Sequence, residues 1–584
     1  MALILNKFRF SERSKKNMKK SHWSNFQITD ILPSLCLISS LFIVIYILQL
    51  GIMPLVSQDE VRYAEVAREM IVSGNWVVPR LDGIDYFEKP VLGHWMNAVS
   101  ELVFGGNNFA VRFSSAFCTG LSAVLLFFFL RKFSKEEKIA LLAPVIFLTS
   151  GLILAIGTFS VLDAQISFFI TAAMASFYAA YCSKKITPKF LWLVLCGVFA
   201  GLGFLTKGFL VFVVLTISIA LFLIWEKKWK NLFTMPWIPL ITAIITILPW
   251  GINVYYQAPD FWRYFIVVEH YDRFMHAGKY SGALHPEPFW FFIPILFVGA
   301  LPWAFHLPEI IVGLKDKILF SKSLTRYCVI WAVFPFIFFS ASSGKLATYI
   351  LPCFPPLAVL IAYGLYNALD KCKKEKLFNT TNLIFGYFLI TALAAAVIYV
   401  IISRFFNIPT LWNLKQLLTG IVAVSFWTAL MFFIKKATHP LNKLLLFALA
   451  PILAMSLKSY LTPESALTNI AHEKFISEQS KFITKDTTVM AYQDMMGAVC
   501  WYLKRDDIYV YGKPGELEHP LKQPEFQSRF INKEKAAAFI SEKRNNTGGA
   551  AIFLRTKNRK DIPIVSDIDA IKDKTMFSKF NPKQ

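Results

Sequence analysis

Ionisable side chains crowd one early stretch of an otherwise apolar chain. Residues 59–90 read DEVRYAEVAREMIVSGNWVVPRLDGIDYFEKP and lie between two strongly hydrophobic segments. Two adjacent acids, Asp59 and Glu60, are followed at once by Arg62 and Tyr63. A single acid here would fit the capping of a helix start. Two acids beside a cation and a phenol favour a polar binding site over an ordinary solvated loop.

Isolated cations elsewhere in the chain have the chemistry of a phosphate site. Lys89 follows Glu88 directly, and the proline after it favours an extended backbone that turns the two side chains apart. Lys207 and Lys345 stand nearly alone at the ends of apolar segments. Such cations neutralise oxyanion charge when they converge in a site of low dielectric constant. A surface ion pair at 88–89 and lysines that merely reach the membrane interface are the alternatives.

The elements that must position these groups are membrane helices. Of 584 residues 55% are hydrophobic and only 17% are charged, against about 25% charged in soluble domains. Apolar runs of the length that crosses a bilayer recur along the chain. They predict thirteen spans, at 31–50, 109–130, 139–156, 164–182, 190–205, 209–225, 235–255, 288–306, 327–341, 349–367, 383–402, 414–433 and 444–460.

Charge places one side of these spans in the cytoplasm. The N-terminal segment and alternate loops carry 28 Lys and Arg, whereas the short loops on the other side hold almost none. This asymmetry predicts a cytoplasmic N-terminus and accounts for the net charge of +23 without nucleic acid. The opposite, outer face is then predicted to gather the loop 51–108, Asp163, Lys207, the loop 256–287 and Lys345.

The chain is predicted to divide into a membrane domain, 1–460, and an outer α/β domain, 461–584. Short β-rich runs at 488–492, 508–511 and 550–554 indicate the sheet of the outer domain. In the first outer loop, 59–73 and 91–104 are too short to span and are expected to lie as helices in the interface. The aromatic, basic loop 256–287 is expected to contact membrane lipids. No phosphate-binding glycine motif occurs, which argues against nucleotide use and an ATP-driven pump.

The opening motif resembles a known family. DEVRYAEVAREM, SGNW and YFEKP, with the later FLTKGF and SGKLATYILPCFPPLA, are similar to the lipid A 4-amino-4-deoxy-L-arabinose transferases. These are undecaprenyl-phosphate-dependent membrane glycosyltransferases related to protein O-mannosyltransferases. The resemblance covers the membrane part and implies a polytopic α-helical GT-C fold of about 13 transmembrane helices in the bacterial inner membrane. The C-terminal domain shows no recognisable match.

The resemblance also implies roles for particular residues. Asp59 and Asp163 match catalytic acids, and Glu88 with His270 matches a structural divalent metal site, Zn²⁺ being the implied ion. The predicted substrate-binding residues, which line the pocket for the carrier phosphate, are Glu60, Arg62, Tyr63, Tyr86, Lys89, Lys207, Lys345 and Tyr349.

The implied reaction moves an amino sugar from undecaprenyl phosphate to a lipid A phosphate with inversion at the anomeric carbon, on the periplasmic side. Aminoarabinose and an amino-hexose such as galactosamine both fit a carboxylate-lined site. One alternative is transfer to a hydroxyl group, as in the O-mannosyltransferases, which needs Asp59 as a general base. The other is a lipid flippase or transporter, for which charges at mid-membrane and inverted repeats are expected.

Overall fold

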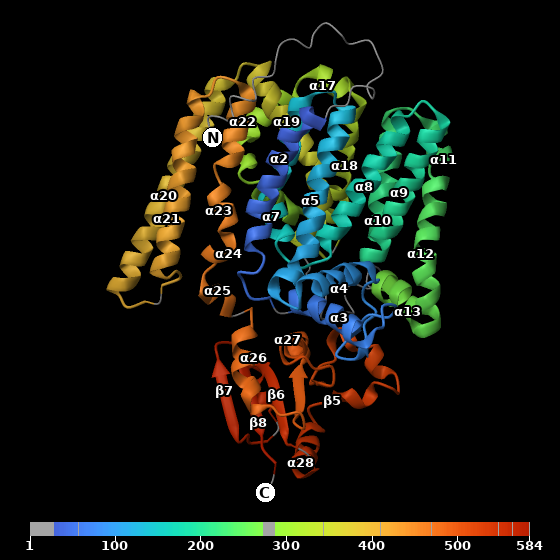
Figure 1. Ribbon diagram of the computed structural model, residues 1–584, viewed down its shortest axis with the longest axis vertical. Coiled ribbons are helices and arrows are strands. Elements are labelled where there is room, and N and C mark those ends of the chain that lie inside the picture. Colours follow the sequence, from blue (N-terminus) through green and yellow to red (C-terminus); the bar gives the residue numbers. More distant parts are fainter. Residues whose placement is uncertain are drawn as a thin grey trace.

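A helical bundle and a smaller sheet domain make up the molecule (Figure 1). The computed structural model describes residues 28–56, 58–272, 287–342, 344–408, 410–468, 470–546, 548–562 and 564–582. The bundle helices are α2 (Ile28–Ile45), α5 (Asn108–Phe133), α6 (Glu137–Leu148), α7 (Gly151–Gly157), α8 (Asp163–Cys182), α9 (Ile186–Lys207), α10 (Leu210–Trp225), α12 (Trp237–Gln257), α15 (Phe292–Gly299), α16 (Leu307–Leu314), α18 (Ser323–Ala341), α19 (Phe354–Asp370), α20 (Glu375–Phe405), α21 (Leu414–Phe433), α22 (Pro440–Leu449) and α23 (Ile452–Ser456).

Short helical turns connect these elements. They are η2 (Ile47–Gln49), α11 (Trp229–Thr234), η4 (Phe289–Phe291), η5 (Trp303–His306), α17 (Lys317–Ser321), η6 (Ala347–Cys353), η7 (Ile434–Lys436), α24 (Lys458–Leu461) and α25 (Glu464–Thr468).

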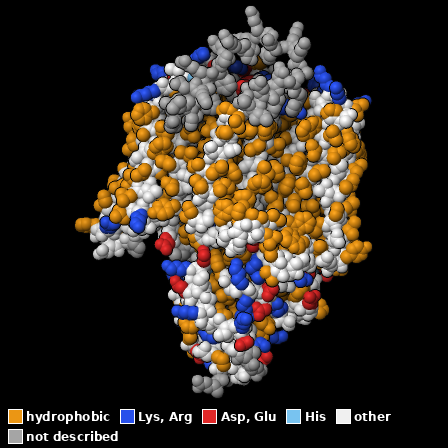
Figure 2. All heavy atoms as spheres, viewed as in Figure 1, with side chains coloured by type: hydrophobic (Ala, Val, Ile, Leu, Met, Phe, Trp, Pro, Cys, Tyr) orange, Lys and Arg blue, Asp and Glu red, His pale blue; other side chains and the backbone are white. Residues whose placement is uncertain are grey.

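The apolar segments predicted from sequence are helical in the structure. Within the described residues, nine helices are long and apolar enough to cross a membrane, or up to eleven spans when two bent pairs count as one each. Two shorter apolar helices, Leu210–Trp225 and Pro440–Ser456, coincide with the other predicted segments. Figure 2 shows the resulting belt of hydrophobic side chains, with Lys and Arg at one rim and mixed charges over the sheet domain. The polytopic helical class is therefore confirmed.

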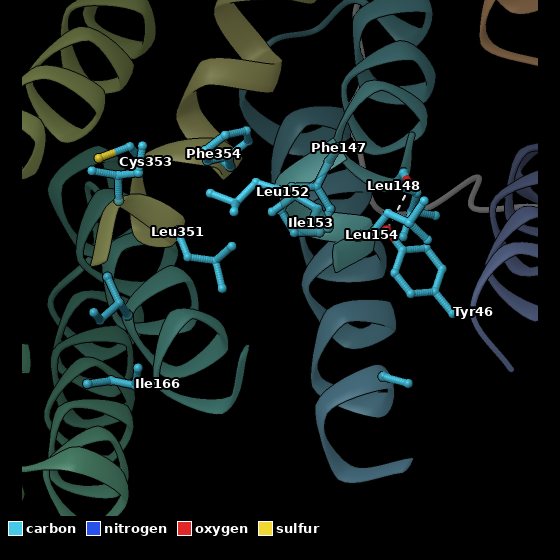
Figure 3. Close-up of a cluster of buried hydrophobic side chains, with 14 of the residues drawn as sticks. Tyr46, Phe147, Leu148, Leu152, Ile153, Leu154, Ile166, Leu351, Cys353 and Phe354 are labelled. Atoms are coloured by element: carbon cyan, nitrogen blue, oxygen red, sulfur yellow. Dashed lines mark hydrogen bonds between the residues drawn. The ribbon is translucent and has the colours of Figure 1, made fainter. Parts of the chain in front are cut away.

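The bend between α6 and α7 lies in a buried apolar cluster. The two helices meet at 60°, and the hydroxyl of Tyr46 donates a 2.7 Å hydrogen bond to the carbonyl of Leu148, the last residue of α6. This bond satisfies a carbonyl that the break leaves without a helical partner. In Figure 3, Leu152 of α7 extends toward Phe354 of α19, and Tyr46 lies on the other side of α7. Close packing on both sides holds the broken span in place.

Two glycines let α9 approach α12 closely. A Cβ atom on Gly197 would lie 1.8 Å from Thr242 Oγ1, and one on Gly201 would lie 2.7 Å from Thr246 Cβ. Small residues four apart are typical of tightly packed membrane helices, because they bring the backbones into contact. The packing matters for the site, since α9 ends at Lys207 and α12 leads directly into the second outer loop.

The first outer loop folds into two short helices that flank a small hairpin. The helices are α3 (Glu60–Ser73) and α4 (Leu92–Phe104), and the strands are β1 (Arg80–Leu81) and β2 (Ile84–Asp85). Gly74 ends α3 in the left-handed conformation, with φ 69°, which glycine adopts without steric cost. Both helices lie between the bundle and the sheet domain (Figure 1).

The second outer loop continues from α12. It contains α13 (Asp260–Arg263) and η3 (Tyr264–Asp272), a π-helix. Residues 273–286 lie outside the described residues, and so does that part of the predicted contact with membrane lipids.

The C-terminal domain is built on one mixed sheet. Its order is β5-β4-β3-β6-β8-β7, with β3 parallel to β4 and β6, β4 parallel to β5, and β8 antiparallel to β6 and β7. Three strands match the predicted runs, and β5, β7 and β8 are additional. The elements are α26 (Glu473–Gln479), η8 (Ser480–Phe482), β3 (Thr488–Tyr492), α27 (Gln493–Leu503), β4 (Tyr509–Tyr511), η9 (Gly515–Leu517), η10 (Pro520–Lys522), η11 (Gln527–Arg529), β5 (Phe530–Ile531), α28 (Ala536–Asn546), β6 (Ala550–Arg555), η12 (Thr556–Asp561), β7 (Ile568–Lys572) and β8 (Thr575–Phe580).

This domain is fixed to the first outer loop by a buried carboxylate. Asp82, in the turn between β1 and β2, is fully buried. Its Oδ1 accepts a 2.9 Å hydrogen bond from the Ile508 amide and lies 3.0 Å from Arg529 Nη2. A buried charge is tolerated when it is paired and hydrogen-bonded. The pairing therefore sets the orientation of the sheet domain over α3.

Candidate functional site

The start of α3 is anchored to the bundle through Glu60. Its carboxylate is fully buried and accepts two 2.6 Å hydrogen bonds from the Arg112 guanidinium of α5. It also accepts bonds from the amides of Val56 and Ser160, at 3.0 and 2.9 Å. A two-pronged carboxylate–guanidinium pair is strong and directional. With its oxygens bonded in the interior, Glu60 positions α3, and its predicted contact with substrate stays a prediction.

Its neighbour Asp59 points the other way. The side chain of Asp59 is 54% exposed, and one oxygen lies 3.4 Å from Arg62 Nη2. Burial by the surrounding protein raises the pKa of this carboxyl, Arg62 opposes the rise, and the negative charge of Glu516 adds to it. Of the two acids that open the motif, Asp59 is the one exposed at the surface.

Three cations meet around the buried phenol of Tyr63. Arg62 lies over the Tyr63 ring, 5.1 Å from its centroid. Burial raises the pKa of the Tyr63 hydroxyl, and the positive charges of Arg62, Lys89 and Lys207 each lower it. These cations come from α3, from the loop after β2 and from the end of α9, respectively. The structure thus brings together the separated cations that the sequence singled out for a phosphate pocket.

Each of these cations has an acidic partner. Lys207 Nζ lies 2.7 Å from Asp163 Oδ1, which joins the last residue of α9 to the first of α8. Lys89 Nζ donates a 2.8 Å hydrogen bond to Glu269 Oε1 of η3 and lies 4.0 Å from Glu88. The cluster is therefore electrically compensated, and its cations are held in fixed positions.

The segment 345–349 places one of its two predicted site residues, Tyr349, near the cations and the other, Lys345, elsewhere. Tyr349, in η6, lies beneath Lys207, whose Nζ is 5.5 Å from the ring centroid. Lys345 is 4% exposed, and its ammonium donates hydrogen bonds of 2.7 and 2.5 Å to the carbonyls of Glu287 and Ser342. Tyr349 therefore belongs to the cluster of cations around Tyr63. The Lys345 ammonium is instead bound by two nearby backbone carbonyls.

Tyr86 and Glu88 line the same region from the loop after β2. The Tyr86 hydroxyl donates to Glu88 Oε2 at 3.4 Å. Burial raises the pKa of Glu88 to about 7, and Glu516 is the next largest cause of the rise, while Lys89 opposes it. Glu88 therefore changes charge near neutral pH, unlike an ordinary surface carboxylate.

Sequence reasoning missed His94. Its ring is buried on α4 between Tyr63 and Tyr86, with centroids 5.8 and 6.1 Å apart. Burial, with Arg62 and Lys89 nearby, lowers its pKa to about 3, so the ring is neutral. Neither ring nitrogen has a hydrogen-bond partner within the described residues. No signal in the sequence sets it apart, because it lies on the buried face of an amphipathic helix.

The second missed residue comes from the C-terminal domain. Glu516, in η9, forms an ion pair with Arg62. Its charge also contributes to the raised pKa values of Asp59, Tyr86 and Glu88. It lies 454 residues from Arg62 in the chain, so no local pattern could have assigned it to the site.

The predicted metal site names two donor side chains, Glu88 and His270. His270 Nδ1 lies 2.7 Å from the Phe265 carbonyl. Because a carbonyl can only accept, Nδ1 carries a proton in this contact. Within the described residues, no group of three or more His, Cys, Asp or Glu side chains is arranged to hold a metal. Glu88 and His270 alone do not complete a zinc site, so no step of the reaction is assigned to a metal.

Comparisons with known proteins cover both parts of the chain. Residues 34–265 match the family model of dolichyl-phosphate-mannose-protein mannosyltransferases. Residues 468–577 match the C-terminal domain of the arabinosyl transferase ArnT. The expectation that the C-terminal domain has no recognisable match was therefore wrong.

Curated relatives and solved structures extend over almost the whole chain. Undecaprenyl phosphate-alpha-4-amino-4-deoxy-L-arabinose arabinosyl transferases of Shewanella sediminis and Erwinia tasmaniensis are 35% and 37% identical, over 85% and 89% of this chain and 90% and 93% of theirs. The crystal structure of ArnT from Cupriavidus metallidurans in the apo state has a TM-score of 0.78 at 19% identity, over 94% of this chain and 98% of that one. The structure of the same protein bound to undecaprenyl phosphate has a TM-score of 0.76 at 20% identity, over 95% of this chain and 98% of that one.

Fold and family matches together define a membrane glycosyltransferase of the GT-C type, with a cluster of paired cations and acids at one end of its helical bundle. The extent and identity of the sequence matches make the assignment more specific. The chain belongs to the family of undecaprenyl phosphate-4-amino-4-deoxy-L-arabinose arabinosyl transferases.

Proposed function

We propose that this protein transfers 4-amino-4-deoxy-L-arabinose from undecaprenyl phosphate to a phosphate of lipid A, at the periplasmic face of the bacterial inner membrane. The observation that carries the proposal is the convergence of Arg62, Lys89 and Lys207 on Tyr63, beside the exposed carboxylate of Asp59. A phosphate group needs such cations, and the oxocarbenium-like centre beside it needs a carboxylate.

In the proposed reaction, the bond between the anomeric carbon and the carrier phosphate oxygen breaks. An oxygen of the lipid A phosphate forms a new bond to that carbon from the opposite face, so the configuration inverts. Undecaprenyl phosphate leaves with its negative charge stabilised by Arg62, Lys89 and Lys207. The lipid-linked sugar supplies the driving force, and no nucleotide takes part.

A strong base is not needed for this acceptor. The second pKa of a phosphate monoester is about 6, so its oxygen is already ionised near neutral pH. Asp59 is then assigned to the sugar, where it stabilises positive charge at the anomeric carbon. Asp163 acts through Lys207, which it holds in place at 2.7 Å.

Mass spectrometry of lipid A, from cells with and without this protein, tests the proposal. The expected product is lipid A whose mass has grown by one aminoarabinose unit on a phosphate, and Asp59→Ala or Lys89→Ala abolishes it. Protein levels in the membrane fraction must match wild type. Unchanged lipid A modification in both variants would refute the site, and a different added mass would refute the sugar.

A further inference from the structure

The ion pair between Arg62 and Glu516 joins the two parts of the protein at the proposed pocket. The Arg62 side chain is 16% exposed and that of Glu516 is 28% exposed. The contact is therefore partly exposed, so that a ligand can reach both side chains.

The surrounding structure is shaped to make this contact. Gly497 of α27 faces the backbone of Arg62, and a Cβ atom there would lie 3.4 Å from Arg62 Cα. Gly515 precedes Glu516 with φ +55°, and a Cβ there would lie 2.2 Å from Gln493 Cδ. Gly497 thus leaves α27 in ordinary van der Waals contact with α3, and Gly515, whose backbone conformation glycine favours, lets η9 pack closely on Gln493 of α27.

Glu516 lies among the predicted substrate-contacting residues. It shares Arg62 with Asp59, the N-cap residue of α3: Glu516 pairs with Nη1 of Arg62, and Asp59 Oδ1 lies 3.4 Å from Nη2. The carboxylate of Glu516 therefore faces the start of α3, on the same guanidinium as the exposed carboxylate of Asp59.

The charges of the donor are complementary to those of Arg62 and Glu516. Under the proposed function, the donor carries one negative charge on its phosphodiester and one positive charge on its amino group. When the phosphate binds Arg62, Glu516 loses its counter-ion. An unpaired carboxylate in a partly desolvated site is costly, and a nearby ammonium removes that cost.

We propose that Glu516 determines specificity for the amino sugar, because its carboxylate binds the ammonium group of the donor after the donor phosphate has replaced it on Arg62. The proposal rests on the proposed function. A donor with a hydroxyl group in place of the amine leaves Glu516 without a counter-ion, so it is discriminated against. The C-terminal domain thereby contributes a side chain to the selection of the sugar.

The test uses the full chain, purified in detergent, with two donors. One is undecaprenyl phosphate-linked 4-amino-4-deoxy-L-arabinose, and the other is the same lipid carrying L-arabinose, which has a hydroxyl at the same carbon. Glu516→Gln keeps the shape of the side chain and removes its charge. The matched control is Glu518→Gln, two residues further on, where the carboxylate is 61% exposed and pairs with Lys522 at 2.8 Å.

Glu516→Gln is expected to reduce the preference for the amine donor, measured as the ratio of the two kcat/KM values, by about tenfold or more. Glu518→Gln should keep the wild-type ratio. Binding of undecaprenyl phosphate without a sugar provides a second readout. Because Glu516→Gln no longer has a carboxylate for the phosphate to displace, it should bind this lipid more tightly than wild type, whereas mere damage to the fold would weaken binding.

An unchanged donor ratio in Glu516→Gln, or weaker binding of undecaprenyl phosphate, overturns the proposal while leaving the proposed function intact. If wild type transfers neither sugar to lipid A, the proposed function fails, and the role of Glu516 fails with it.

Discussion

Lys89 Nζ donates a 2.8 Å hydrogen bond to Glu269 Oε1, across 180 residues of the chain. The side chains are 15% and 10% exposed. The pair links the loop after β2 to η3 and fixes the ammonium beside the other two cations of the pocket. Its strength follows from charge-assisted hydrogen bonding in a partly desolvated site.

Loss of the Lys89 ammonium should reduce sugar transfer far more than loss of the charge on Glu269. Lys89→Ala is expected to lower kcat/KM for transfer by about 100-fold or more, since it removes a group that stabilises the leaving phosphate. Glu269→Gln, which leaves the cation present but less fixed, should cost about tenfold. The measurement is the initial rate of sugar transfer to lipid A in detergent.

A matched control lies at the opposite rim of the bundle. Lys322 pairs with Glu136 at 2.7 Å, with side chains 39% and 35% exposed. Lys322→Ala should transfer at the wild-type rate, because exposed ion pairs contribute little. Equal losses in Lys89→Ala and Lys322→Ala would contradict the assignment of Lys89.

Substitution of Asp59 should reduce sugar transfer, whereas substitution of the adjacent Glu60 should reduce stability. Asp59→Asn is expected to lose transfer while keeping the thermal stability of wild type, because its side chain is exposed. Glu60→Gln breaks a buried pair and leaves Arg112 uncompensated, at a cost of about 3–5 kcal/mol of stability. Thermal unfolding in detergent, measured beside transfer rates, separates the two. The reverse pattern would show that Asp59 is the structural acid.

In the metal-free protein, stability should depend on pH through Glu88, whereas a bound zinc would keep its carboxylate ionised. Its pKa is about 7 in the folded protein against an ordinary value of 4.5. Between these values the folded state binds the extra proton, so stability is highest below about pH 4.5 and falls as pH rises through 7. Glu88→Gln removes this contribution, and its melting temperature should fall less than that of wild type between pH 5 and pH 8. Parallel pH curves for the two proteins would contradict the raised pKa.

Packing between α9 and α12 should affect the pocket from within the membrane. Gly197→Ala forces a Cβ atom to within 1.8 Å of Thr242 Oγ1, and overpacking of this kind costs about 1–3 kcal/mol. Gly420→Ala is the control, since its nearest neighbour would be 3.6 Å away. We expect lower melting temperature and slower transfer in Gly197→Ala only. Equal behaviour of the two variants would argue against this contact.

A structural zinc at Glu88 and His270 stays a prediction. Elemental analysis of the purified protein should find about one zinc per chain, and Glu88→Gln or His270→Ala should lose it. Removal by a chelator should lower the melting temperature of wild type and leave both variants unchanged, because bound metal adds to folding free energy. If wild-type protein contains no zinc and a chelator leaves its melting curve unchanged, the prediction of a structural zinc is wrong.

Much of the fold follows from local sequence, and the exceptions have physical reasons. Hydropathy located the membrane helices because each is about as long as the bilayer is thick. Strand β8 escaped prediction because its polar residues are buried: Lys579 is 5% exposed and donates a 3.0 Å hydrogen bond to Thr487 Oγ1. Thr487, the partner of Lys579, lies 92 residues earlier in the chain. The local alternation of polar and apolar residues therefore does not show that Lys579 is buried.

The site divides in the same way. Residue types and charge distribution alone predicted that Asp59, Arg62, Lys89 and Lys207 share one face of the membrane domain, since membrane orientation depends on loop charge. Only the tertiary structure decided which acid faces outward, that Arg112 binds Glu60, and that the C-terminal domain contributes Glu516 to Arg62. Ion pairs form between groups brought together by folding, and nothing in the neighbourhood of either residue specifies its partner.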